Sequence, residues 1–133
     1  MSTTYQYQMQ ILERHLDTFG HVNNATYLEI YEEARWDVIS QKGFGLKKIQ
    51  EKQIGPVILD LQLAFKAELK NREMITIETN VGEMKNRMVC VFHQRILKAD
   101  GTVASTLDLS IGLMDLKARK LIAPTPEWMN AIQ

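Results

Sequence analysis

The chain has 133 residues, of which 45% are hydrophobic, and 16 Lys and Arg side chains balance 16 Asp and Glu side chains. This length is typical of one domain with one core, so we expect a single domain over residues 1–133. The charge balance argues against nucleic acid or an anionic membrane as a partner. No apolar run reaches the roughly 18 residues that a membrane-spanning helix needs. Because the first residues also lack the features of a signal peptide, we expect a cytoplasmic protein without membrane insertion.

The first third of the chain predicts a strand, a loop and one long helix. Apolar and polar side chains alternate over 5–11, which is typical of a half-buried strand. After a loop over 13–22, a helix begins near Asn23 or Asn24, two favoured N-cap residues, and ends near Lys42 and Gly43. Its apolar positions recur at helical spacing and are Tyr27, Ile30, Tyr31, Ala34 and Val38.

Strands dominate the rest of the chain. A polar stretch over 45–55 looks mobile, and the tail beyond Lys117 looks irregular. Asp100-Gly101 is a hairpin signal between the last two strands. The predicted strands cover 57–66, 74–81, 88–97 and 103–113. The strand over 88–97 is apolar on both faces, which predicts a central strand covered on both sides.

The predicted order is one strand, one long helix and four consecutive strands. Consecutive strands joined by short turns favour an antiparallel meander, against which the single apolar helix face must be buried. We therefore expect an α+β fold in two layers. One helix leaves sheet edges and one sheet face uncovered, which favours at least a symmetric dimer.

The most specific pattern lies where the loop enters the helix. It runs Asp17-Thr18-Phe19-Gly20-His21-Val22-Asn23-Asn24-Ala25-Thr26-Tyr27, and the helix that follows carries Glu and Arg side chains. The acidic side chain stands beside unpaired backbone N–H groups and the positive end of the helix dipole. A carboxylate beside a preorganised donor for a developing oxyanion is what acyl transfer requires.

This pattern resembles the signature of hotdog-fold acyl-CoA thioesterases, and within them that of the 4-hydroxybenzoyl-CoA thioesterase-like family. The resemblance implies a hotdog fold, in which an antiparallel five-stranded sheet wraps around one long helix. It implies hydrolysis of an acyl-CoA thioester to a free carboxylic acid and CoA. It further implies a homodimer or a homotetramer that is a dimer of dimers, and we expect no cofactor.

The resemblance assigns the catalytic roles to the loop and the first turn of the helix. Asp17 acts as nucleophile or general base, although a loop Asp before a glycine is by itself typical of a simple turn. The thioester carbonyl is polarised by a backbone N–H near Asn24 or Ala25. His21 either orients the substrate and relays a proton or is a loop residue without a chemical role. Asn23 and Asn24 are expected to cap the helix, and one of them is also a candidate to hold the Asp17 carboxylate or an attacking water molecule.

Further residues are candidates for substrate binding, and each also has a plain structural interpretation. Tyr27, Tyr31 and Phe65 would line an acyl pocket or form the core, with 45–55 as a gate. Some hotdog thioesterases carry their catalytic carboxylate on the helix, and Glu33 is the candidate for that arrangement in this chain. The plain interpretation is that Glu33 belongs to the solvated face of the helix. Lys85 and Arg87 would meet the CoA phosphates or are ordinary surface charges.

Other functions are less well supported by the sequence. Hydrolysis of thioesters on acyl carrier protein, and binding of acyl-CoA without catalysis, are the alternatives. The three histidines show no paired metal spacing, so we expect no metal site. The single cysteine, Cys90, excludes an internal disulfide and lies in an apolar run, where a buried and inert thiol is expected.

Overall fold

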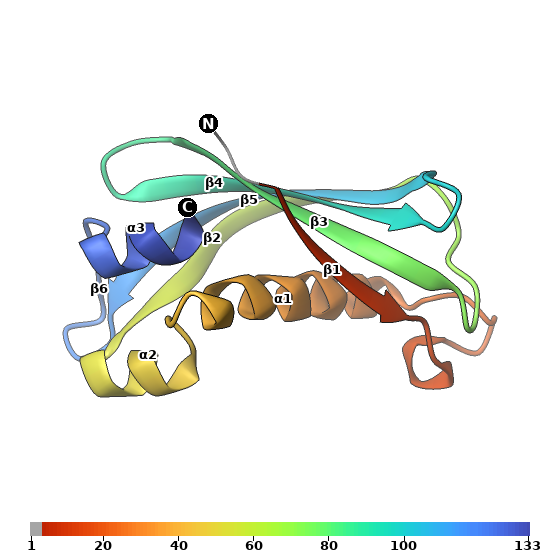
Figure 1. The fold of residues 1–133 in the computed structure, drawn as a ribbon, viewed down its shortest axis with the longest axis horizontal. Helices are drawn as coiled ribbons and strands as arrows, with labels where there is room; N and C mark the ends of the chain where they lie inside the picture. Colours follow the sequence, from red (N-terminus) through yellow and green to blue (C-terminus); the bar gives the residue numbers. More distant parts are fainter. Residues whose placement is uncertain (1–3) are drawn as a thin grey trace.

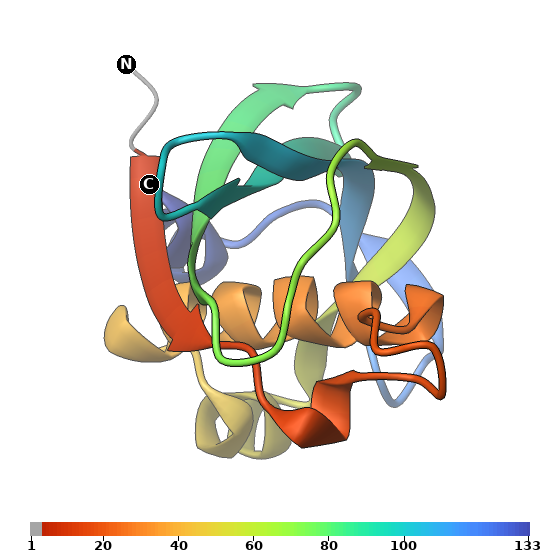
Figure 2. The same ribbon diagram turned by 90° about the vertical axis from the view of Figure 1, so that its right-hand side faces the viewer.

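The computed structural model describes residues 4–133 as a curved antiparallel sheet that lies over one long helix (Figures 1 and 2). The helix α1 is Asn24–Gln41, and the shorter helices are the 3₁₀ turn η1 (Glu13–His15), α2 (Leu46–Lys52) and α3 (Pro126–Ile132). The strands are β1 (Thr4–Gln10), β2 (Ile54–Phe65), β3 (Met74–Met84), β4 (Val89–Lys98), β5 (Val103–Asp115) and β6 (Lys120–Ile122). The predicted α+β class and the order of the main elements are confirmed.

The strand order in the sheet is β1-β3-β4-β5-β2, and β6 pairs with β5. The predicted meander is therefore correct only for β3, β4 and β5. The chain leaves β2 at one edge and passes through residues 66–73 to β3, while β1 forms the opposite edge. In that connection Lys66 and Ala67 donate their N–H groups to the carbonyl of Ala104 at distances of 2.8 and 3.0 Å. These bonds tie the connection to β5 and so fix its path beneath the end of the sheet.

Helix α1 has the predicted boundaries because both of its ends carry the expected signals. At the N-terminus the Asn23 side chain accepts a hydrogen bond from the N–H of Ala25 at 2.9 Å, which satisfies one of the free donors of the first turn. At the C-terminus Gly43 adopts a φ of 85°, a left-handed conformation that suits glycine. The predicted apolar stripe is buried against the sheet, and Tyr31 and Ala34 are fully covered.

Two predictions for the rest of the chain were wrong. The stretch over 45–55, expected to be mobile, contains α2, whose Ile49 is buried. The tail, expected to be irregular, forms β6 and α3, so the sheet has a sixth short strand beyond the five expected. In α3, Trp128 packs edge-to-face on Phe44 with the ring centres 5.3 Å apart. Short segments of this kind depend on tertiary packing and carry little periodicity of their own.

Within this chain the outer face of the central strand β4 is covered only at the start of the strand, where Val89 is buried. Cys90, Phe92 and Gln94 point to the helix side and are buried, whereas His93 and Arg95 are exposed on the outer face. Within the described residues 4–133, the expected cover on both sides is therefore present at the start of β4 and absent further along it. The buried, free Cys90 agrees with the prediction of an inert thiol, and burial raises its pKa.

The Asn23 cap gives a direct test of what positions the helix N-terminus. Replacing Asn23 with Ala removes the acceptor and should lower the free energy of unfolding by about 0.5–2 kcal/mol. Asn23→Asp keeps an acceptor oxygen and should retain most of the stability. Urea denaturation of the two variants beside the parent protein measures both effects. Equal stability of Asn23→Ala and the parent would show that the cap contributes nothing.

Candidate active site

An open cleft of about 370 Å³ lies at the N-terminus of α1. Three segments build it: the loop that precedes the helix, the first turn of the helix, and the end of β2 with the connection that follows. Its lining residues are Asp17, His21, Val22, Asn24, Tyr27, Phe65, Lys66, Ala67, Glu68 and Leu69. The structure thus brings five residues of the predicted site together.

The loop before the cleft is closed by bonds to Asp17. Its Oδ1 atom accepts from the N–H of Phe19 at 2.9 Å and from that of His21 at 3.2 Å. Its own N–H donates to the carbonyl of His21 at 2.8 Å, and Gly20 turns the chain with a φ of 80°. Asp17 therefore stabilises the turn, as expected for a loop Asp before a glycine. Both bonds end on Oδ1, so Oδ2 is left for other donors.

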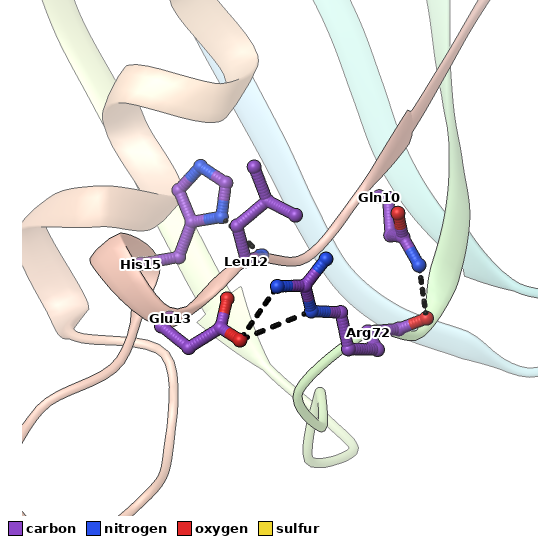
Figure 3. A network of polar contacts seen from close by, with 5 residues as sticks. All are labelled: Gln10, Leu12, Glu13, His15 and Arg72. Carbon is purple, nitrogen blue, oxygen red and sulfur yellow. Dashed lines mark hydrogen bonds and ion pairs between the residues drawn. The ribbon is translucent and has the colours of Figure 1, made fainter.

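A second network fastens the chain just upstream of Asp17 (Figure 3). Arg72 donates to Oε1 of Glu13 through Nε and Nη2 at 3.1 and 2.7 Å, and its carbonyl accepts from the Gln10 side chain at 3.0 Å. The Nδ1 atom of His15 accepts from the N–H of Leu12 at 2.8 Å. Burial lowers the pKa of His15, which favours the neutral ring that this acceptor role requires. Together these bonds hold the start of the loop against the 70–73 turn.

The backbone N–H groups of Asn24 and Ala25, at the helix N-terminus, are the predicted donors for an oxyanion. The N–H of Ala25 is already bonded to the Asn23 side chain, and that of Thr26 donates to the Asn23 carbonyl at 3.0 Å. Of the two predicted donors, the N–H of Asn24 is therefore the one without a hydrogen-bond partner among residues 4–133. Asn24 also lines the cleft.

His21 meets a partner that the sequence analysis did not identify. Its Nε2 atom lies 2.6 Å from Oε1 of Glu68, and both side chains are about half exposed. Glu68 lies in the connection between β2 and β3, far from His21 in the chain. A single sequence holds no signal for such a pair, because the crossover that brings the two together is a tertiary feature.

Two aromatic residues form the apolar wall of the cleft. The rings of Tyr27 and Phe65 meet edge-to-face with their centres 4.9 Å apart. Tyr27 is buried and burial raises its pKa, whereas Phe65 is 51% exposed. An exposed phenylalanine on the rim of a cleft offers apolar surface to a ligand or to another protein chain.

The other predicted binding residues do not line this cleft. Tyr31 is fully buried and donates a hydrogen bond to Ser105 Oγ at 2.9 Å. Glu33 lies on a different cleft, beside His15 and Glu29, and accepts from the hydroxyl of Tyr7 at 2.5 Å. This bond, with burial and the Glu33 charge, raises the pKa of Tyr7 to about 12.

The predicted cations for CoA are likewise distant from Asp17 within one chain. Lys85 and Arg87 lie in the turn between β3 and β4, at the end of the sheet opposite to the loop before α1 (Figure 1). Lys85 lies 3.8 Å from the carboxylate of Asp60. Among residues 4–133, no three His, Cys, Asp or Glu side chains gather in a way that could hold a metal ion. No helix in the same range is both long enough and apolar enough to cross a bilayer.

A second cleft, of about 280 Å³, lies between the later turns of α1, the start of β2 and α3. Its walls are mainly apolar and include Trp36, Ile39, Val57, Ile58 and Trp128. Arg35 also lines it and donates to Oε1 of Gln94 at 2.9 Å. Burial lowers the pKa of this guanidinium.

Comparison with known proteins identifies the family. Residues 12–132 match the model of the thioesterase-like superfamily. The chain belongs to this superfamily. It is 26% identical over 128 residues to the long-chain acyl-CoA thioesterase FadM of Escherichia coli, with 96% of each chain covered. It is 22% identical over 114 residues to the acyl-CoA thioester hydrolase YbgC of the same species, with 86% of this chain and 84% of YbgC covered.

Solved structures of similar proteins agree with this family assignment. The probable thioesterase YbaW of Escherichia coli superposes with a TM-score of 0.82 at 26% identity, covering 96% of this chain and 97% of YbaW. A Staphylococcus aureus protein, SAV2348, determined in complex with CoA, superposes with a TM-score of 0.89 at 17% identity, covering 99% of this chain and 83% of that one. The predictions of a hotdog-fold thioesterase and of a thioester-hydrolysing enzyme are therefore confirmed.

Tyr31 offers a test between core packing and contact with substrate. Because its ring is fully buried among core residues, Tyr31→Ala should lower the free energy of unfolding by about 3–5 kcal/mol. The order of preference among acyl chain lengths should stay the same. Melting temperature and turnover of a series of thioesters measure the two effects. A shift of preference toward longer chains would instead place Tyr31 on the acyl pocket.

Proposed function

We propose that this protein hydrolyses acyl-CoA thioesters, with Asp17 as nucleophile or general base in the cleft at the N-terminus of α1. The observation that carries the proposal is the meeting of a carboxylate, an imidazole and a helix N-terminus on one cleft. The relatives FadM and YbgC are named as acyl-CoA thioesterases, and SAV2348 was determined with CoA bound. These names support acyl-CoA as the substrate class.

In this proposal each group in the cleft has a separate task. The N–H of Asn24, at the positive end of the α1 dipole, donates a hydrogen bond to the thioester oxygen as negative charge develops on it. Oδ2 of Asp17 either attacks the carbonyl carbon or takes a proton from the water that attacks. Tyr27 and Phe65 contact the first atoms of the acyl group. The bulky, charged nucleotide stays toward solvent at the open side of the cleft.

We also infer that the site is completed in a homodimer formed through β2. This strand is at the sheet edge, and four of its apolar side chains are 40–51% exposed: Ile58, Leu59, Leu61 and Phe65. Long, exposed and apolar edges are rare in monomers because they pair with other chains. A two-fold axis must pair two copies of one edge strand antiparallel. Such pairing brings Phe65 of one copy near the start of β2, and hence near the second cleft, of the other copy.

The catalytic role of Asp17 is tested by Asp17→Asn. The amide keeps an acceptor for the Phe19 and His21 N–H groups but is neither a nucleophile nor a base, so the fold should persist while thiol release falls by orders of magnitude. Thiol release from a panel of acyl-CoAs measures the activity, and circular dichroism measures the fold. Full activity of a folded Asp17→Asn would refute the role, and Glu33 would be tested next.

The dimer is tested by placing a charge on the β2 edge. Leu61→Glu should convert the dimer to a monomer and lower turnover, because each site loses the surface that the second copy supplies. Light scattering at micromolar concentration measures the mass. Met74→Glu is a matched control, since Met74 is 49% exposed but lies on β3. A parent protein that is monomeric and fully active would contradict the proposal.

A further inference from the structure

We propose that Glu68 is a positioning residue that holds the His21 ring in the one tautomer and orientation able to exchange a proton with the reacting thioester. The inference rests on the proposed thioesterase function and assigns a role in it to a residue outside the loop and helix motif. Its basis is the 2.6 Å contact between Nε2 of His21 and Oε1 of Glu68 inside the cleft that Asp17 lines.

The contact determines where the hydrogen of the neutral ring lies. An ionised carboxylate accepts hydrogen bonds and donates none, so the Nε2 atom must carry the hydrogen. The Nδ1 atom of His21 then holds the lone pair. None of the hydrogen bonds among residues 4–133 engages this Nδ1 atom, so it is the nitrogen that can take or give a proton.

The position of the ring is held from two sides. The backbone of His21 is fixed by Asp17, since its N–H donates to Oδ1 and its carbonyl accepts from the Asp17 N–H. Glu68 is fixed through its neighbours, because Lys66 and Ala67 bond to Ala104 in β5. The half-exposed imidazole therefore bridges the catalytic loop and a connection that the sheet anchors. Without Glu68, nothing among these contacts would restrain rotation of the ring.

With His21 as proton carrier, the proton that the attacking water loses can reach the sulfur of the leaving CoA. Neutral His21 takes at Nδ1 a proton from the water whose oxygen becomes bonded to the acyl carbon, directly or through Asp17. The imidazolium then gives this Nδ1 proton to the sulfur as the carbon–sulfur bond breaks, so CoA leaves as a thiol. Thioester and water thus become carboxylic acid and thiol, and the protein ends unchanged. Between the two transfers the imidazolium is stabilised by the adjacent Glu68 carboxylate.

The charges that line the cleft fit this assignment. Besides Asp17 and Glu68, the lining includes one cation, Lys66. A surface ion pair of this exposure contributes little to stability. Loss of the Glu68 carboxylate should therefore be felt in turnover far more than in folding.

The test is a double-mutant cycle on turnover. Glu68→Ala should lower kcat by about 10-fold with little change in KM, which is a part of the roughly 10²–10⁴-fold that a positioned acid–base group supplies in full. Glu68→Asp should recover part of the loss. In a His21→Ala background, Glu68→Ala should have no further effect, because a residue that acts through His21 has nothing left to position. The proposal would be overturned if Glu68→Ala lowered kcat equally in the parent protein and in His21→Ala. It would also be overturned if Glu68→Ala were as active as the parent protein.

A matched control exists on the outer face of the sheet. There Nδ1 of His93 lies 2.6 Å from Oδ1 of Asp108, and both side chains are about half exposed. Asp108→Ala removes a carboxylate from a His pair of the same length outside the cleft and should leave kcat unchanged. If Asp108→Ala lowered kcat as much as Glu68→Ala does, both effects would be due to general destabilisation, and the assignment would be overturned.

A readout independent of catalysis separates this inference from the proposed function. Nitrogen NMR of the histidine rings should show His21 with hydrogen on Nε2 in the parent and a mixture of tautomers in Glu68→Ala. A parent protein that releases no thiol but shows this change would refute the thioesterase proposal and leave the pair intact. The same tautomer mixture in both proteins would refute the role of Glu68 even if the parent is active.

Discussion

The burial of one helix face against a curved sheet is the constraint on which the rest of this structure depends. The apolar stripe of α1 is buried against the concave side of the sheet, and this packing fixes the position and orientation of the helix. Tyr31 sits at the middle of this contact, and its hydroxyl bonds to Ser105, which in turn donates to the carbonyl of Ala64 in β2. Helix, central sheet and edge strand are thus linked through one tyrosine. The position of the helix N-terminus follows, and with it the place of the cleft.

The cleft then arises from segments that are each held for structural reasons. Asp17 closes its own loop with bonds to Oδ1, and Asn23 caps the helix through Ala25. Asp17 and Asn24, which these bonds hold in place, both line the cleft. Structural and chemical interpretations of these residues are therefore compatible. A group held by several backbone bonds needs little reorganisation when charge develops beside it.

The sequence predicted those parts of the molecule whose signals are local. The boundaries of α1 follow from Asn23 and Gly43, and β1 from alternation over 5–11. Helix α3 was missed because a single turn or two of helix around Trp128 is stabilised by Phe44, far away in the chain. The meander was partly wrong because turn length does not reveal that β2 lies at an edge. Glu68 was missed for the same reason: only the crossover after β2 brings it to His21.

The buried amide of Gln94 also has a consequence for the accuracy of folding. Its Nε2 donates to Thr79 Oγ1 and to the carbonyl of Tyr31, and its Oε1 accepts from Arg35. A slip of β4 by one residue would turn this amide to the outer face and carry the charged side chain of Arg95 into the core. An apolar side chain at this position would pack against the helix in several registers with similar energy. The hydrogen bonds of the Gln94 amide therefore favour the native register of β4 over a register shifted by one residue.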